Sequence, residues 1–249
     1  MVNLNTVVRF LNKELKIRKI KDSSRNGLQT RGRDDIKRIA FGVDACMELF
    51  VKAKKERCDI IIVHHGLLWK GMKRTELLDR RIDFLRKNKI SLYAAHLPLD
   101  LHNKYGNNIE ICGILKLKNI KKFGNYHGIN IGYSGDTQKE IEFYDLINLI
   151  NKEFKVRSKN LNFGKNIIKR IGVVSGGGAD AIPEASKKAD CLLTGEIKHS
   201  NYHTAKELKT NVISAGHYAT ETFGVKALMP ALKQKFNIET IFIDIPTKL

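Results

Sequence analysis

The chain has 249 residues, of which 42% are hydrophobic and 29% are charged, as is typical of a globular protein with one large domain or two small ones. No apolar run approaches the roughly 20 residues of a membrane span, and four scattered cysteines without a C-x-x-C motif argue against a zinc ribbon or a disulfide framework. The net charge of +19 favours contact with polyanions but does not identify one.

The first half of the chain predicts alternating helices and strands. Apolar residues recur at helical spacing in the N-terminal segment and are interrupted by charges, which indicates an amphipathic helix and not a signal peptide. We therefore expect a cytoplasmic protein that makes no membrane contact. A loop rich in turn-forming residues follows at 22–35. In order, we expect a helix at 4–15, a strand at 38–44, a helix ending near 58, strands at 60–63 and 90–96, and helices at 74–88 and 107–116.

The second half continues the alternation. Residues 117–137 are punctuated by glycine and strand-like, and we expect them to carry the chain from one half to the other. Strands that alternate with helices predict an α/β protein with mostly parallel sheets. The further elements expected are helices at 138–154, 183–189, 199–208 and 219–236 and strands at 168–174, 191–196, 211–217 and 240–245.

Residues 37–65 and 169–196 look like two copies of one unit. Each opens with Lys-Arg-Ile, runs through a strand and a helix that ends in basic residues, and enters a second strand led by Asp59 or Asp190. Six residues after that aspartate comes His65 in one copy and Glu196 in the other. We therefore predict an α/β fold of two intertwined, structurally similar repeats with mostly parallel mixed sheets. The expected domains are 1–125 and 126–249, with the final helix and strand free to pack on the first half.

Side chains typical of metal ligands follow the predicted strands. Ligands of α/β proteins gather at the carboxyl ends of the strands, and each half continues to a further strand that ends in a histidine and a carboxylate four residues apart. We therefore expect one shared site at the junction of the two repeats. Its candidates are His64, His65, His96, Asp100, Glu196, His217 and Glu221.

The mixture of imidazoles and carboxylates suits Zn, Fe, Mn, Co or Ni better than Mg or Ca. Neighbouring side chains of a regular strand point in opposite directions, so His64 and His65 both bind metal only if the strand turns into a loop there or if two metals are present. A carboxylate that bridges two cations is a common way to hold a two-metal site, and Glu221 is our candidate bridge. We expect two divalent transition-metal ions per chain.

Two other patterns leave alternatives open. The run Ser175–Gly178 between strand and helix is either an anion cradle or a tight turn, and it lacks the lysine of a nucleotide-binding P-loop. The basic clusters at 16–21, 31–38 and 116–122 are either solvated surface or a nucleic-acid surface, and no interleaved aromatics mark a stacking platform. No G-x-S-x-G motif suggests a serine nucleophile.

Six stretches of the chain resemble the GTP cyclohydrolase I type 2 homologue family, also called Nif-three-like. They lie in the family's order across nearly the whole chain. They are DSSRNGLQ (22–29), IIIVHHGLLWKG (60–71), AAHLPLDLHNKYGNN (94–108), SGGGAD (175–180), LLTGEIKHSNYH (192–203) and SAGHYATETFGV (214–225). The region from 117 to 137 is too short for the domain inserted in longer members, so the chain resembles the short form.

The resemblance implies roles for particular residues. His65 and Asp100 would hold one metal, His64 and His217 the other, and Glu221 would bridge them. The polar side chains implied around that centre, as substrate or supporting groups, are His96, Glu196, His199 and His203. The family also implies assembly into ring-like homo-oligomers, commonly hexamers.

Three functions follow from these patterns. The first is a metal-dependent hydrolase that acts on a nucleotide-like, phosphorylated or ring-amide substrate through metal-activated water, with ring opening of GTP implied by the family name alone. The second is a non-enzymatic protein that binds single- or double-stranded DNA or RNA, or acts as a scaffold, with structural metals. The third is a metal-storage or metal-chaperone protein, which the bridging carboxylate disfavours.

Overall fold

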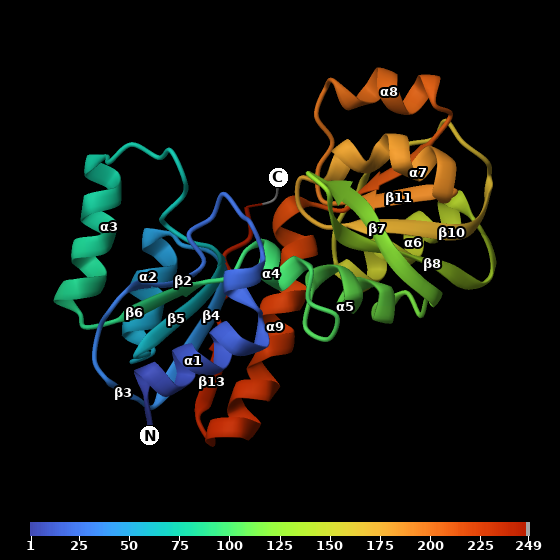
Figure 1. Cartoon of the computed structure of the whole chain (residues 1–249). Coiled ribbons are helices and arrows are strands. Elements are labelled where there is room, and N and C mark those ends of the chain that lie inside the picture. Colours follow the sequence, from blue (N-terminus) through green and yellow to red (C-terminus); the bar gives the residue numbers. More distant parts are fainter. Residues whose placement is uncertain (248–249) are drawn as a thin grey trace. The chain divides into compact units, whose positions relative to one another are not determined.

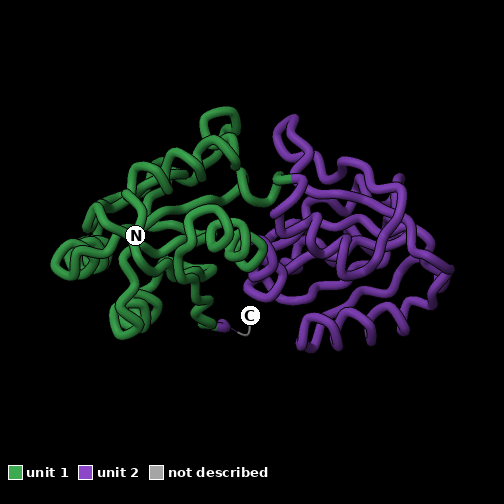
Figure 2. Tube along the Cα trace, turned by 90° about the horizontal axis from the view of Figure 1, so that it is seen from below, with its two compact units in different colours: residues 1–102, 225–245 green, residues 103–224, 246–249 purple. Residues whose placement is uncertain are grey.

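The computed structural model describes residues 1–247, which form two compact units (Figures 1 and 2). Unit 1 consists of Met1–His102 and Val225–Ile245, and unit 2 of Asn103–Gly224 and the short stretch that begins at Pro246. The first boundary therefore falls after residue 102, before the expected 125. The reason is that α5 (Asn107–Ile114) buries Ile111 and Cys112 in the core of unit 2.

Unit 1 is built on a five-stranded sheet in the order β13-β4-β5-β6-β2. The first four strands are parallel, and β2 pairs with β6 in the antiparallel direction. One face of the sheet packs against two helices that share a hydrophobic core with it, α2 and α3. The strands and helices of this unit are β1 (Val2–Asn3), α1 (Leu4–Glu14), β2 (Gly27–Thr30), β3 (Asp35–Ile36), β4 (Arg38–Asp44), α2 (Met47–Lys55), β5 (Ile60–His65), α3 (Glu76–Lys87), β6 (Ser91–Ala94), α4 (Leu97–Asp100) and β13 (Glu239–Phe242).

Helix α1 packs on the sheet through the side chain of Tyr93, whose hydroxyl donates to Asn12 at 2.9 Å. The β-branched run of β5 is fully buried, as expected of a central parallel strand. The long helix α9 (His217–Phe236) begins in unit 2 and ends in unit 1.

Unit 2 is built on a six-stranded sheet in the order β7-β8-β10-β11-β12-β9. Only the pairs among β10, β11 and β12 are parallel. Helices α5 and α6 share a core with one face, and α7 and α8 share a second core with the other. The remaining elements are β7 (Lys118–Tyr126), β8 (Ile129–Glu142), α6 (Phe143–Phe154), β9 (Lys159–Leu161), β10 (Ile167–Val174), α7 (Ile182–Lys188), β11 (Cys191–Thr194), α8 (Asn201–Glu207) and β12 (Asn211–Ser214).

The repeat seen in the sequence makes the same contact in both units. The carboxylate of Asp59 accepts hydrogen bonds from the backbone N–H groups of residues 37 and 38, at 2.7 and 3.1 Å. The carboxylate of Asp190 accepts from those of residues 169 and 170, at 3.0 and 2.9 Å. In each unit the aspartate therefore ties the start of its own strand to the start of the preceding one.

The expected α/β fold with mixed sheets is confirmed, and the sheet of unit 1 is the more parallel of the two. Two local expectations were wrong. The helix expected from 138 begins at Phe143, because β8 continues to pair with β10 as far as Glu142. The loop expected at 22–35 contains β2, because its turn-forming residues end where pairing with β6 begins.

The four cysteines are free thiols, and three of them are buried. Burial raises the pKa of Cys58 to about 12, and that of Cys112 also to about 12. These thiols therefore pack as small apolar groups, as expected, and do not supply a thiolate. Among the described residues, none of the helices combines the length and the apolarity that crossing a membrane requires.

Candidate metal centre

Three histidines of unit 1 gather at one edge of its sheet. His64 and His65 end β5, and His96 follows the neighbouring parallel strand β6. The ring centroids are 4.6 Å apart for His64 and His65, 5.1 Å for His64 and His96, and 5.5 Å for His65 and His96. Each ring offers a nitrogen within 4.8 Å of a nitrogen of the other two, which is close enough for a shared metal ion.

Every one of these rings has an oxygen acceptor at its Nδ1 atom. A carbonyl or a carboxylate accepts a hydrogen bond from Nδ1–H, so Nδ1 carries the proton and the Nε2 lone pair is left for a metal. The partners are the Ala95 carbonyl at 2.9 Å for His64, Asp44 at 2.8 Å for His65 and Asp22 at 2.9 Å for His96. The donor set therefore fits a divalent transition metal, both in chemistry and in the way its rings are held.

A buried carboxylate adds to this group. Asp100 ends the short helix α4, and its Oδ2 atom lies 3.5 Å from Nε2 of His64. The resemblance pairs Asp100 with His65, and in unit 1 an ion pair joins it to His64. His96, expected around the metal centre, offers a ring nitrogen within 4.8 Å of nitrogens of His64 and His65.

Asp22 and Asp44 are functional candidates that the sequence analysis missed. Asp22 is in the loop of turn formers, yet its side chain is only 2% exposed. It also accepts from the backbone N–H of Leu97 at 3.0 Å and from the side chain of Asn26 at 2.8 Å. Burial by itself raises the pKa of Asp22. The hydrogen bond and charge of His96, with smaller contributions from Asn26 and Ser24, lower the pKa by more than burial raises it, so that it falls to about 2. The carboxylate is therefore ionised whenever the histidines are able to bind metal.

Asp22→Asn is expected to weaken metal binding by the three histidines about 10- to 100-fold, because an amide holds the His96 ring less firmly than a carboxylate does. Chelator competition with Co²⁺ on full-length protein measures the change. Asp34→Asn is the matched control, since Asp34 is exposed and pairs only with Arg31 in the salt bridges of the described residues. Equal affinities for the two variants would remove Asp22 from the site.

The same variant predicts a pH dependence. A folded-state pKa of about 2 is below the ordinary 3.8, so the carboxylate of Asp22 stabilises the fold above pH 4 and this stabilisation is lost as the pH falls toward 2. The difference in free energy of unfolding between wild type and Asp22→Asn should therefore shrink from pH 5 to pH 2. Urea unfolding of the metal-free proteins at several pH values measures it.

Unit 2 contains a second group of candidate ligands at the start of α9. His217 and Glu221 are one helical turn apart and share a face. The His217 ring lies between two carboxylates, with Nδ1 at 3.1 Å from Glu196 and Nε2 at 3.2 Å from Glu221. Burial lowers the pKa of His217, but hydrogen bonds and charge from Glu221 and Glu196 raise it more, to about 9. The two carboxylates that stabilise the positive charge of protonated His217 would also stabilise a metal cation, which would replace the proton on the ring.

The absence of a side chain at Gly176 leaves space for the side chains of Glu221 and His217. The Gly176 φ of +60° is one that side-chain-bearing residues rarely adopt, and an added Cβ would overlap Oε1 of Glu221 and lie 3.0 Å from Nε2 of His217. The N–H groups of Ser175 and Gly176 donate to Asn108 at 2.7 Å and to Thr220 at 3.0 Å. Because these two donors are used within unit 2, the tight-turn interpretation is favoured over an anion cradle.

The remaining candidates of the sequence analysis lie in unit 2 as well. Glu196 contacts His217, as described. His199 and His203 are exposed at the start of α8, and within the described part of unit 2 no contact joins either of them to His217 or Glu221. The candidate ligands thus form two groups, His64, His65, His96 and Asp100 in unit 1 and Glu196, His217 and Glu221 in unit 2.

Comparison with known proteins agrees with these motifs. The family model described as Duf34/NIF3 (NGG1p interacting factor 3) matches residues 2–248. The chain belongs to this family. A Duf34/NIF3 relative from Pyrococcus abyssi, named GTP cyclohydrolase 1 type 2 homolog, is 45% identical over 245 residues and covers 98% of each chain. One from Archaeoglobus fulgidus with the same name is 41% identical over 250 residues and covers 100% of each chain.

Solved structures share the fold over the whole length. Protein ybgI, described as of unknown function, superposes with a TM-score of 0.94 at 28% identity and covers 100% of both chains. TTHA1606 from Thermus thermophilus superposes with a TM-score of 0.92 at 35% identity and also covers 100% of both. The resemblance drawn from the sequence motifs is confirmed.

Proposed function

We propose that this Duf34/NIF3 protein is a metal-dependent hydrolase whose centre combines the two groups of ligands. The observation that carries the proposal is the anchoring of all three Nδ1 atoms in unit 1, which fixes the orientation of three imidazole rings that lie close together. His64, His65 and Asp100 would hold metal with His217 and Glu221, the latter as the bridge. Two divalent transition-metal ions in such a centre lower the pKa of water and polarise a carbonyl or phosphoryl group.

The protein's own residues have distinct parts in this proposal. Asp22 and Asp44 hold the rings of His96 and His65 in place, and Glu196 does the same for His217. The positive net charge favours a nucleotide-like or otherwise phosphorylated substrate. The name of the curated relatives makes GTP one compound to test.

A substrate screen tests the hydrolase. Metal-loaded protein is incubated with GTP, other nucleotides, phosphodiesters and cyclic amides, and product is measured by liquid chromatography. His96→Ala is expected to bind metal more weakly and, at saturating metal, to lose turnover at least about 100-fold. His127→Ala, which changes an exposed histidine of the β7–β8 turn, should keep wild-type turnover. Absence of turnover on every compound would contradict the proposal.

A second function is favoured by the edge of the unit 2 sheet. The edge strand β7 exposes Lys118 and Lys121, within a basic cluster that runs from 116 to 122. A nucleic-acid surface there would bind more weakly as salt rises, with a log–log slope set by the number of phosphates neutralised. Binding to DNA and RNA that is absent, or that ignores salt, would remove this alternative.

A further inference from the structure

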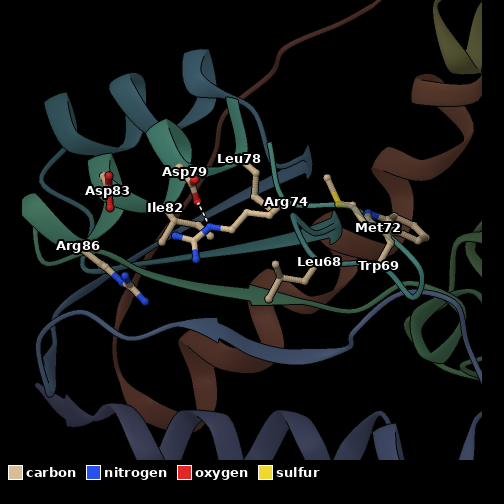
Figure 3. Close-up of a pocket in the computed structure, with 9 residues that line it drawn as sticks. All are labelled: Leu68, Trp69, Met72, Arg74, Leu78, Asp79, Ile82, Asp83 and Arg86. Atoms are coloured by element: carbon tan, nitrogen blue, oxygen red, sulfur yellow. Dashed lines mark hydrogen bonds and ion pairs between the residues drawn. The ribbon is translucent and has the colours of Figure 1, made fainter. Parts of the chain in front are cut away.

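Unit 1 contains a cavity of about 320 Å³ between helix α3 and the segment that leads into it (Figure 3). The apolar side chains of Leu68, Leu78 and Ile82 line it. Trp69 and Met72 lie at one end, and Arg86 lies at the other (Figure 3). A volume of this size is at the lower end for small-molecule sites and accommodates a compound of one or two rings.

Trp69 places one end of the cavity beside the candidate metal ligands. The centroid of its indole ring is 5.0 Å from that of the His96 ring, with an angle of 70° between the ring planes, and 6.1 Å from that of the His65 ring. The indole N–H donates to the carbonyl of Gly66 at 3.0 Å, and the backbone of Trp69 pairs with Ser24. The ring is thus held in place as a wall between the cavity and the histidines. A compound in the cavity would therefore lie next to them.

The end formed by Trp69 and Met72 suits a planar ring. An indole face and a thioether are both polarisable and favour contact with aromatic groups. Met72 is 48% exposed, a high value for a large apolar side chain, and Leu77 nearby is 47% exposed. A ring bound there would cover apolar surface that is otherwise in water.

The charges around the cavity favour an anionic group on that compound. Arg74 donates from its Nε atom to Asp79 at 2.7 Å, and this hydrogen bond does not use its two terminal nitrogens. Arg86 makes no ion pair with any other residue that the structure describes. Two arginines and two aspartates line the cavity, and since Arg74 is paired with Asp79, Arg86 is the lining cation that is available to an anion. Guanidinium groups bind phosphate and carboxylate through paired hydrogen bonds.

We propose that this cavity binds an aromatic anion, with its ring against Trp69 and Met72 and its phosphate or carboxylate at Arg86. Binding in the cavity does not rest on the proposed function, because the lining needs no metal.

Tryptophan fluorescence tests the binding directly, because Trp69 is the only tryptophan in the chain. Phenyl phosphate is titrated into the full-length protein, both as purified and after treatment with EDTA. Benzyl alcohol, benzylamine and inorganic phosphate are titrated alongside it. Phenyl phosphate is expected to change the emission saturably with and without chelator. Each of the other three probes should bind at least about tenfold more weakly than phenyl phosphate, since each lacks the ring or the anion.

Two arginines of α3 make a matched pair of variants. Arg86→Ala is expected to raise the dissociation constant of phenyl phosphate about tenfold and to leave that of benzyl alcohol unchanged. Arg80→Ala removes another exposed charge from the same helix, where Arg80 pairs with Glu76 at 4.0 Å and does not line the cavity. It should leave both constants unchanged, and circular dichroism confirms that each variant is folded.

Three results would overturn this proposal. They are tighter binding of benzylamine than of phenyl phosphate, equal effects of the two arginine variants, and binding that disappears in EDTA, which would assign the anion to bound metal. Metal content is measured on the same samples. Chelator-resistant binding without any metal in the purified protein would retain the cavity proposal and count against the hydrolase alone.

Discussion

Glu221→Gln is expected to reduce the transition-metal content of the purified protein from about two ions per chain to well below one. Glu221 is 3% exposed and lies 3.2 Å from Nε2 of His217. A glutamine of the same size has a neutral amide, which cannot bridge two cations, so both ions should be lost together. Elemental mass spectrometry on untagged protein, purified without chelator, measures the content of wild type and variant side by side.

Glu207→Gln is the control for this experiment, because Glu207 is an exposed carboxylate at the end of α8 in the same unit. It should keep the wild-type metal content. If Glu221→Gln keeps two ions per chain, Glu221 is not the bridge. If wild type holds no metal even after soaking with Zn, Mn, Fe or Co, the hydrolase proposal fails and nucleic-acid binding becomes the better explanation.

Gly176→Ala should both destabilise unit 2 and disturb its candidate ligands. The new Cβ would overlap Oε1 of Glu221, so that carboxylate has to leave its position beside His217. We expect the free energy of unfolding to fall by about 3 kcal/mol or more, through backbone strain and overpacking together. Metal content should fall as well, because His217 and Glu221 would be displaced. Urea unfolding of metal-free protein and elemental analysis measure the two effects separately.

Gly128→Ala separates the clash from the backbone strain. Gly128 has a φ of +84° in the β7–β8 turn, and an added Cβ there would meet nothing within 4 Å. This variant should lose only about 1 kcal/mol, the cost of a left-handed alanine, and should keep its metal. Similar losses in both variants would show that Gly176 matters for its backbone conformation and not for the space it leaves to Glu221.

The fold was predictable to the extent that its signals are local. The apolar runs and the repeated Lys-Arg-Ile unit predicted the alternating strands and helices, and the contacts of Asp59 and Asp190 are the same in both units. Pairing partners were harder to predict, because β2 and the end of β8 depend on neighbours far away in the sequence. Turn-forming residues therefore led us to predict a loop where β2 lies, and helical spacing led us to predict a helix over the end of β8.

The candidate ligands were predictable because the sequence places each of them at or just after the end of a strand. The groups that hold these side chains in place were not predictable. The acceptors at Nδ1 of His65, His64 and His96 come from residues 21, 31 and 74 positions away. Asp22 had the sequence context of an ordinary turn former, since nothing local marks a carboxylate that will be buried against a distant ring.

The sequence by itself determined the family and the α/β class and pointed to residue types that could bind a metal ion, because periodicity, repetition and short motifs depend on neighbours along the chain. Only the tertiary structure decided that His96 lies within reach of His64 and His65, that Asp22 and Asp44 contact two of the rings, and that Trp69 both lies beside the histidines and lines a cavity. These are contacts between segments brought together by folding, and the burial that gives them their strength exists only once the sheet and its loops have formed.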